Sequence, residues 1–195
     1  MSFITGTQVE QLYSLTSAIT KNNYTTQAAF TGVLGTNTVC SLPPGWLNND
    51  NPNPVGRSLL LDAWGTIANT AGATFAVALG FDSTAGTIAN SITVYAATAP
   101  TASTTTLWNC HAEYTCTAFT TSQATFQVNG FWTQSATATG AALGTAGLRT
   151  DFQGSISGAT VDPRVQNYIE LFGTWNAASA SNTTTVQQMF LWGLN

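Results

Sequence analysis

Two runs of aromatic and aliphatic residues in the last thirty positions constrain the fold most strongly. The first run, QNYIELFGTW (166–175), alternates, so that Ile169, Leu171 and Trp175 share one face. Strict alternation predicts a half-buried β-strand, and apolar residues on both faces predict a strand covered on both sides. The second run, VQQMFLWGLN (186–195), follows a Ser/Thr/Asn-rich connector. The two runs therefore favour antiparallel strands that form a hairpin.

The second run carries apolar residues at both parities. Val186, Phe190 and Trp192 stand at one parity, and Met189 and Leu191 stand at the other. Because a sandwich strand needs only one inner face, one of the two sets requires a further cover. We expect Met189 and Leu191 to be covered by the N-terminal segment or by a second subunit, and to mark an interface.

The chain from Gln27 onward contains several more strand-like runs, separated by turn-forming residues. These runs are RSLLLDAWGTIA (57–68), ATFAVALGFD (73–82), SITVYAA (91–97), LWNCHAEYTCTAF (107–119) and TFQVNGFWTQS (125–135). Short strands at close spacing predict a single all-β domain over 27–195, either a sandwich or a barrel. A proline-rich loop, LPPGWLNNDNPNPVG (42–56), interrupts the pattern.

Residues 1–26 differ from the rest of the chain. Val9, Leu12 and Ile19 recur at roughly helical spacing, and Thr7 with Glu10 forms a capping-box pattern. This segment predicts a short N-terminal arm or helix, which lies on its own domain or docks on a neighbouring subunit. The residues expected at such a contact are Phe3, Ile4, Val9, Leu12 and Leu15.

The charge content excludes several classes of partner. Only 6% of the residues are charged, and the net charge is −4 with four Lys and Arg in total. Nucleic-acid binding needs clustered cations, so no nucleic-acid partner is expected. No apolar run approaches the length of about 20 residues that a membrane span needs, and the start of the sequence has no secretory signal pattern. We therefore expect no membrane association, and either a mature form or a release route such as lysis.

The richest cluster of reactive side chains is WNCHAEYTC (108–116). Cys110 and His111 are adjacent, so on a strand they point to opposite faces and cannot share a metal ion or a proton. The second half of a zinc site is absent from the sequence. We expect Cys40, Cys110 and Cys116 to be free buried thiols, with no metal, no cofactor and no catalytic residue.

Tryptophan supplies the remaining candidates for a binding site. Most of the six tryptophans lie within apolar strand patterns, where core packing is the expected role. Trp46, in the proline-rich loop, and Trp108, beside a polar loop, are the two that we expect to be exposed. An exposed tryptophan could stack on a sugar ring.

Three segments resemble parts of bacteriophage virion structural proteins. They are LPPGWL with VGRSLLLDAWGTIANTAGATFAVALGFDST, then TFQVNGFWTQS, and finally ELFGTWNAASASNTTTVQQMFLWGLN. The resemblance extends over about residues 38–195. The resemblance implies an antiparallel, jelly-roll-like β-sandwich that serves as a capsid decoration (cement) protein or head fibre. It also implies a homo-oligomer, often a trimer, that contacts the major capsid protein or other virion proteins and is made in the host cytoplasm without a signal peptide.

These observations give three hypotheses about function. The first is a non-enzymatic decoration protein that stabilises the head through contacts between subunits. The second is a receptor- or glycan-binding component of a tail or head fibre, which requires exposed aromatic residues. The third, a secreted carbohydrate-active enzyme, requires a cleft with a pair of carboxylates.

Overall fold

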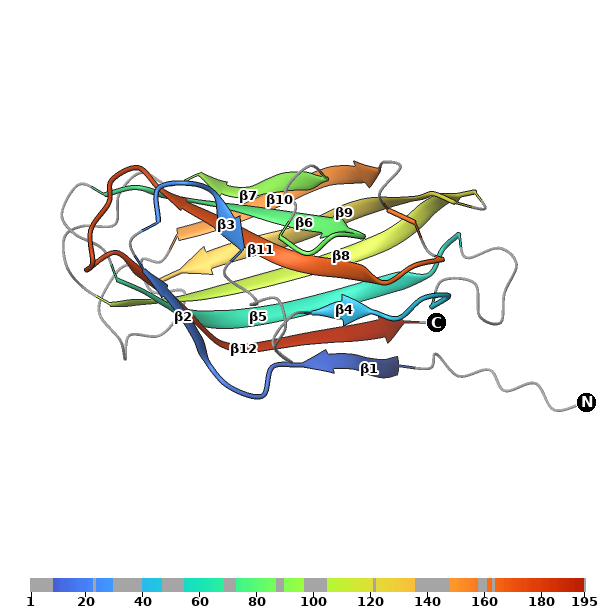
Figure 1. The fold of residues 1–195 in the computed structure, drawn as a ribbon, viewed down its shortest axis with the longest axis horizontal. Coiled ribbons are helices and arrows are strands. Elements are labelled where there is room, and N and C mark those ends of the chain that lie inside the picture. The colour runs from blue at the N-terminus through green and yellow to red at the C-terminus, as the bar shows by residue number, and fades with distance from the viewer. Residues whose placement is uncertain are drawn as a thin grey trace, which may run out of the picture.

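The computed structural model describes residues 9–22, 24–29, 40–46, 55–68, 73–86, 90–96, 105–120, 122–135, 148–157, 161–162 and 164–194. Its regular elements are all β-strands, arranged in two antiparallel sheets that pack as a sandwich (Figure 1). The all-β antiparallel sandwich predicted from the sequence is confirmed. Across the residues described, no helix is long and apolar enough to cross a membrane.

The large sheet has seven strands and contains both ends of the described chain. Its strands are β1 (Val9–Ser14), β2 (Ile19–Asn22), β5 (Ser58–Ala68), β8 (Thr106–Phe119), β9 (Ala124–Gln134), β10 (Leu148–Ser157) and β12 (Thr183–Leu194). The order is β1-β12-β5-β8-β9-β10. Strand β2 also pairs with β12, at the start of that strand, whereas β1 pairs with its end. Strand β12 therefore lies inside the sheet, between β5 and the two N-terminal strands.

The small sheet has five strands. They are β3 (Ala28–Ala29), β4 (Ser41–Leu42), β6 (Phe75–Asp82), β7 (Ser91–Ala96) and β11 (Asn167–Trp175). Strand β11 pairs with β6 on one side and with β3 and β4 on the other. Its inward residues Ile169 and Leu171 lie in the core, and its Phe172 is buried against Ala29 and Ala78 of the neighbouring strands, so the strand is covered on both faces, as its sequence predicts.

The predicted hairpin between the last two strands is wrong. Strand β11 belongs to the small sheet, whereas β12 pairs with β5 in the large sheet, so the connector between them crosses from one sheet to the other. The chain makes the same kind of crossing from β5 to β6. Strands β8, β9 and β10, by contrast, follow one another side by side in the large sheet.

A β-bulge sets the parity of β12. The pairing with β5 shifts between Val186 and Gln188, so Val186 and Met189 both point into the sandwich. Met189 and Leu191 are 0% exposed. The prediction that these two residues form an interface is therefore wrong, because they face the core.

The predicted N-terminal helix is also wrong, since the segment forms strands β1 and β2 along one edge of β12. Leu15 and Ile19 are buried in the core, and the Leu15 amide donates a hydrogen bond to the Met189 carbonyl at 2.9 Å. Strand β1 has a bulge between Gln11 and Tyr13. The bulge and the break between the two strands produce a spacing of apolar residues that imitates a helix.

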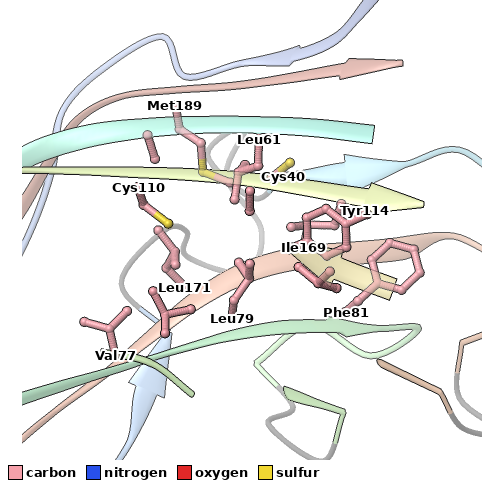
Figure 2. Close-up of a cluster of buried hydrophobic side chains, with 14 of the residues drawn as sticks. Cys40, Leu61, Val77, Leu79, Phe81, Cys110, Tyr114, Ile169, Leu171 and Met189 are labelled. Carbon is pink, nitrogen blue, oxygen red and sulfur yellow. The ribbon is translucent and has the colours of Figure 1, made fainter. Parts of the chain in front are cut away.

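The core is continuous between the two sheets (Figure 2). Met189, Leu61 and Cys110 of the large sheet lie across from Leu79 and Leu171 of the small sheet. A stack of buried rings also bridges the sheets. Tyr95 of β7 packs on Trp132 of β9 at a centroid distance of 5.5 Å, and Trp132 packs on Trp108 at 4.8 Å with planes 6° apart.

Cys40, Cys110 and Cys116 are free and buried, as expected.

Candidate binding site on the large sheet

The outward-facing residues of β12, β5, β8, β9 and β10 form one surface, which we call the outer face. Because side chains alternate along a strand, residues paired across neighbouring strands stand on the same side of the sheet. Pairing places one such row in the order Phe190, Asp62, His111, Phe131 and Asp151. This row joins aromatic and charged side chains on a surface that faces away from the core.

Trp64, Phe190 and Trp192 form an aromatic strip along the outer face. The ring of Phe190 lies 5.6 Å from that of Trp64 and 5.8 Å from that of Trp192, with tilted planes. Trp64 is 38% exposed, while the other two are half-buried. The bulge in β12 is what turns Phe190 and Trp192 outward, toward the face that Trp64 occupies.

Asp62 and His111 form a hydrogen-bonded pair at the centre of the outer face. The Asp62 Oδ1 and His111 Nδ1 atoms lie 2.7 Å apart, and about a third of each side chain is exposed (31% and 35%). The His111 ring stacks on Phe131 at 5.1 Å. These contacts hold the imidazole in a fixed orientation beside the aromatic strip, with part of the Asp62 carboxylate still open to solvent.

An ion pair lies at the β10 edge of the outer face. The Arg149 guanidinium packs over the Phe131 ring at 4.3 Å from its centroid and bonds to Asp151 at 2.9 Å. Both charged side chains are well exposed, so this pair contributes little to stability. It neutralises the single arginine of this face with a neighbouring carboxylate.

Polar side chains flank the aromatic strip on both sides. On the β8 side, Asn109 pairs opposite Trp64 and the exposed Glu113 pairs opposite Leu60. On the β1 side, Ser14 pairs opposite Phe190 and Gln11 opposite Trp192. The strip is therefore an apolar track between two rows of hydrogen-bonding groups.

The two tryptophans predicted to be exposed are both buried. Trp108 is 1% exposed because it points inward from β8 and stacks on Trp132. Trp46 is 9% exposed, and its backbone carbonyl accepts a hydrogen bond from Arg57 Nη1 at 2.9 Å. Trp46 closes the sandwich against Gly193, where an added Cβ would lie 3.0 Å from the indole ring.

Trp64 is the residue that sequence reasoning missed. It stands two positions after Asp62 in RSLLLDAWGTIA, so the two side chains share a face of the strand. A carboxylate in the middle of an apolar strand marks the solvent side, because burying an unpaired charge is costly. That parity was the available signal that Trp64 points outward.

The residues predicted for an N-terminal contact are placed as follows. Leu15 is buried and Leu12 is partly buried against the core. Val9 lies in β1, paired opposite Leu194. Phe3 and Ile4 lie outside the described residues.

The expected separation of Cys110 and His111 is confirmed, since Cys110 is buried in the core and His111 stands on the outer face. Burial raises the pKa of the Cys110 thiol. Within the described ranges, no group of three His, Cys, Asp or Glu side chains is arranged to hold a metal ion.

A second polar cluster joins the small sheet to Lys21 of β2. Glu170 is 4% exposed and accepts a hydrogen bond from the Gly86 amide at 2.6 Å, which ties the β6–β7 turn to β11. Burial raises the pKa of Glu170, and this effect outweighs the opposing effects of the Gly86 amide and of Lys21. Burial likewise lowers the pKa of Lys21, whose ammonium donates to the Ala29 carbonyl. Asp82 accepts hydrogen bonds from the Thr84 amide and the Asn90 side chain, both at 2.9 Å.

These features define the molecule as an antiparallel β-sandwich with an aromatic strip on the outer face of its larger sheet. No family model matches the chain, and no curated protein matches it. Among solved structures, it is similar to the CBM2 module of the evolved Dit of Lactobacillus casei BL23 phage J-1. That likeness covers 97% of each chain at 12% sequence identity, with a TM-score of 0.40.

Proposed function

We propose that the protein is a non-enzymatic structural component of a bacteriophage particle that binds a glycan through its outer face. The observation that carries this proposal is the aromatic strip of Trp64, Phe190 and Trp192 between two rows of hydrogen-bonding side chains. The sequence resemblance over 38–195 supports the assignment to a phage particle.

The strip matches the chemistry of a sugar. A pyranose ring has apolar C–H groups on its faces and hydroxyl groups around its rim. Aromatic rings offer large apolar contact area, and binding sites combine such area with a few polar groups that fix the orientation of the ligand. Trp64 provides the most exposed ring of the strip, and Asp62 and His111 lie beside it.

We assign Asp62 a binding role. Its carboxylate is already bonded to His111, which leaves the remaining acceptor sites for ligand hydroxyls. Charged groups that are fixed by a neighbour make directional hydrogen bonds to a ligand without further ordering cost.

Capsid decoration is the second candidate function, and the same strip favours it. Aromatic residues are enriched at protein interfaces, and an exposed aromatic patch marks a surface that another molecule covers. The low charge of the chain suits a large contact, since few ions have to lose their hydration. In this case the partner is the major capsid protein, and we propose a homo-oligomer, a trimer, as the bound form.

A pair of binding measurements separates the two candidates. Purified wild-type protein and the Trp64→Ala variant are tested on a glycan array and on phage particles that lack the protein. Val165→Ala is the matched control, because Val165 is 44% exposed and lies outside the large sheet. Binding to glycans that is lost in Trp64→Ala supports the first candidate, whereas Trp64-dependent binding to particles alone supports decoration and contradicts glycan binding. Electron microscopy of intact particles then gives the position of the protein.

A further inference from the structure

The geometry of the strip points to the class of glycan. We propose that the outer face binds an extended, uncharged oligosaccharide whose pyranose units carry equatorial hydroxyls and equatorial linkages. This inference rests on the proposed glycan-binding function and adds the substrate class and the residues that select it.

The length of the strip indicates several sugar units. Trp192 pairs opposite Leu60, Phe190 opposite Asp62, and Trp64 opposite Gln188, so the strip follows the strand direction from Gln188 to Trp192 of β12. The Phe190 ring lies 5.6 Å from that of Trp64 and 5.8 Å from that of Trp192, so the two outer rings are separated by no more than the sum of these distances. A row of three rings exceeds one pyranose ring, and a ligand that contacts all three rings must therefore be an oligosaccharide that stays extended.

Equatorial substitution follows from the position of the polar groups. In a pyranose with equatorial hydroxyls, both ring faces are apolar and the hydroxyls point outward in the plane of the ring. When such a ring lies on the strip, its hydroxyls reach Asp62 and Asn109 on one side and Ser14 and Gln11 on the other. An axial hydroxyl makes one of the two ring faces polar, and that face would lose hydration on the aromatic rings, so such a unit can stack through its other face only. An axial linkage turns successive rings out of a common plane, so a chain joined in this way cannot lie along the whole strip.

The charges on the outer face favour an uncharged ligand. Its carboxylates are Asp62, Glu113 and Asp151, while its basic side chains are His111 and Arg149. Both basic groups are bonded to a carboxylate on the same face, at 2.7 Å and 2.9 Å. Glu113, which is exposed beside the strip, would repel a uronic or sialic acid.

The test is a comparison of oligosaccharides by isothermal titration calorimetry with the full chain. Cello-oligosaccharides and N-acetylchito-oligosaccharides represent equatorial linkages, malto-oligosaccharides represent an axial linkage, and an oligogalacturonate represents an anionic chain. We expect binding to an equatorially linked series only, with affinity that increases from the disaccharide to longer chains. Trp64→Ala should weaken it by about tenfold or more, Trp64→Tyr should retain most of it, and Val165→Ala should not change it.

The possible failures are distinguishable. The protein could bind the malto-oligosaccharide or the oligogalacturonate more tightly than the equatorially linked series, with the same dependence on Trp64. That result overturns the substrate class and leaves glycan binding intact. Glycan binding that Trp64→Ala and Phe190→Ala do not weaken overturns the strip as the site. If none of the four series binds and no glycan on the array binds, the proposed function fails together with this inference. Thermal unfolding of each variant confirms that it is folded before binding is measured.

Discussion

The bulge in β12 makes a direct prediction about two adjacent residues, Met189 and Phe190. Met189 is 0% exposed and lies in the core, so Met189→Ala removes buried apolar atoms and leaves a cavity. Substitutions of this kind cost about 2–5 kcal/mol. Phe190 is half-buried on the outer face, and Phe190→Ala removes tilted ring contacts at 5.6 Å and 5.8 Å. Its cost should be about 1–2 kcal/mol.

Without the bulge, strict alternation from Val186 would reverse this order. Phe190 would then be a core residue, and its replacement by alanine would cost about 3–5 kcal/mol. Urea denaturation of the two variants, followed by circular dichroism, gives both free energies of unfolding. Leu191→Ala and Trp192→Ala form a second matched pair with the same expected order. A Phe190→Ala variant that loses as much stability as Met189→Ala would refute the assigned register.

Three further predictions concern stability and reactivity. Because the folded-state pKa of Glu170 is raised, ionisation of this carboxyl lowers the stability of the fold as pH rises through that pKa. Glu170→Gln should therefore be at least as stable as wild type at about pH 7. In melting curves, the advantage of the variant should shrink toward about pH 5. A difference in melting temperature that stays constant with pH would contradict this. Gly130→Ala should lower stability by about 1–3 kcal/mol or more in urea titrations, because the added Cβ would lie 2.1 Å from a backbone oxygen of the adjacent strand. An unchanged unfolding midpoint would show that the two strands separate easily at this position. Burial raises the pKa of the Cys40, Cys110 and Cys116 thiols. Iodoacetamide should therefore label none of them in the native protein and all three after denaturation, and mass spectrometry counts the labels.

Much of the fold could be predicted because alternation within a strand is a local property of the sequence. The runs that contain Leu61, Val77 and Trp132 all form strands, and each of these side chains is buried as its parity predicts. The separation of Cys110 from His111 follows from the same rule.

The errors come from features that are not local. A bulge adds one residue to a strand and reverses the parity of every residue after it, so Met189 and Leu191 exchanged faces with Phe190. The N-terminal segment is a pair of strands only because β12, far away in the sequence, offers it an edge. Its own residues cannot reveal that partner, and their bulged spacing favours a helix.

The two tryptophans that the sequence singled out are not the one that the structure exposes, which is Trp64. Trp46 and Trp108 were expected to be exposed because they stand next to loops, yet loop position says little about which way a large ring points. Both rings fill the interior, where their apolar area contributes most. The parity of Trp64 with Asp62 was a better guide than the distance to a loop.

The position of β12 inside the large sheet also has a consequence for the order of folding. Strand β5 contains the run Leu59, Leu60 and Leu61, and its edge remains unpaired on one side until residues 183–194 dock beside it. Pairing between such distant segments is slow, on the order of milliseconds to seconds. During that time β5 presents an apolar edge that another chain could join. We expect Asp62, which directly follows the three leucines, to act during this time as a charged gatekeeper against aggregation.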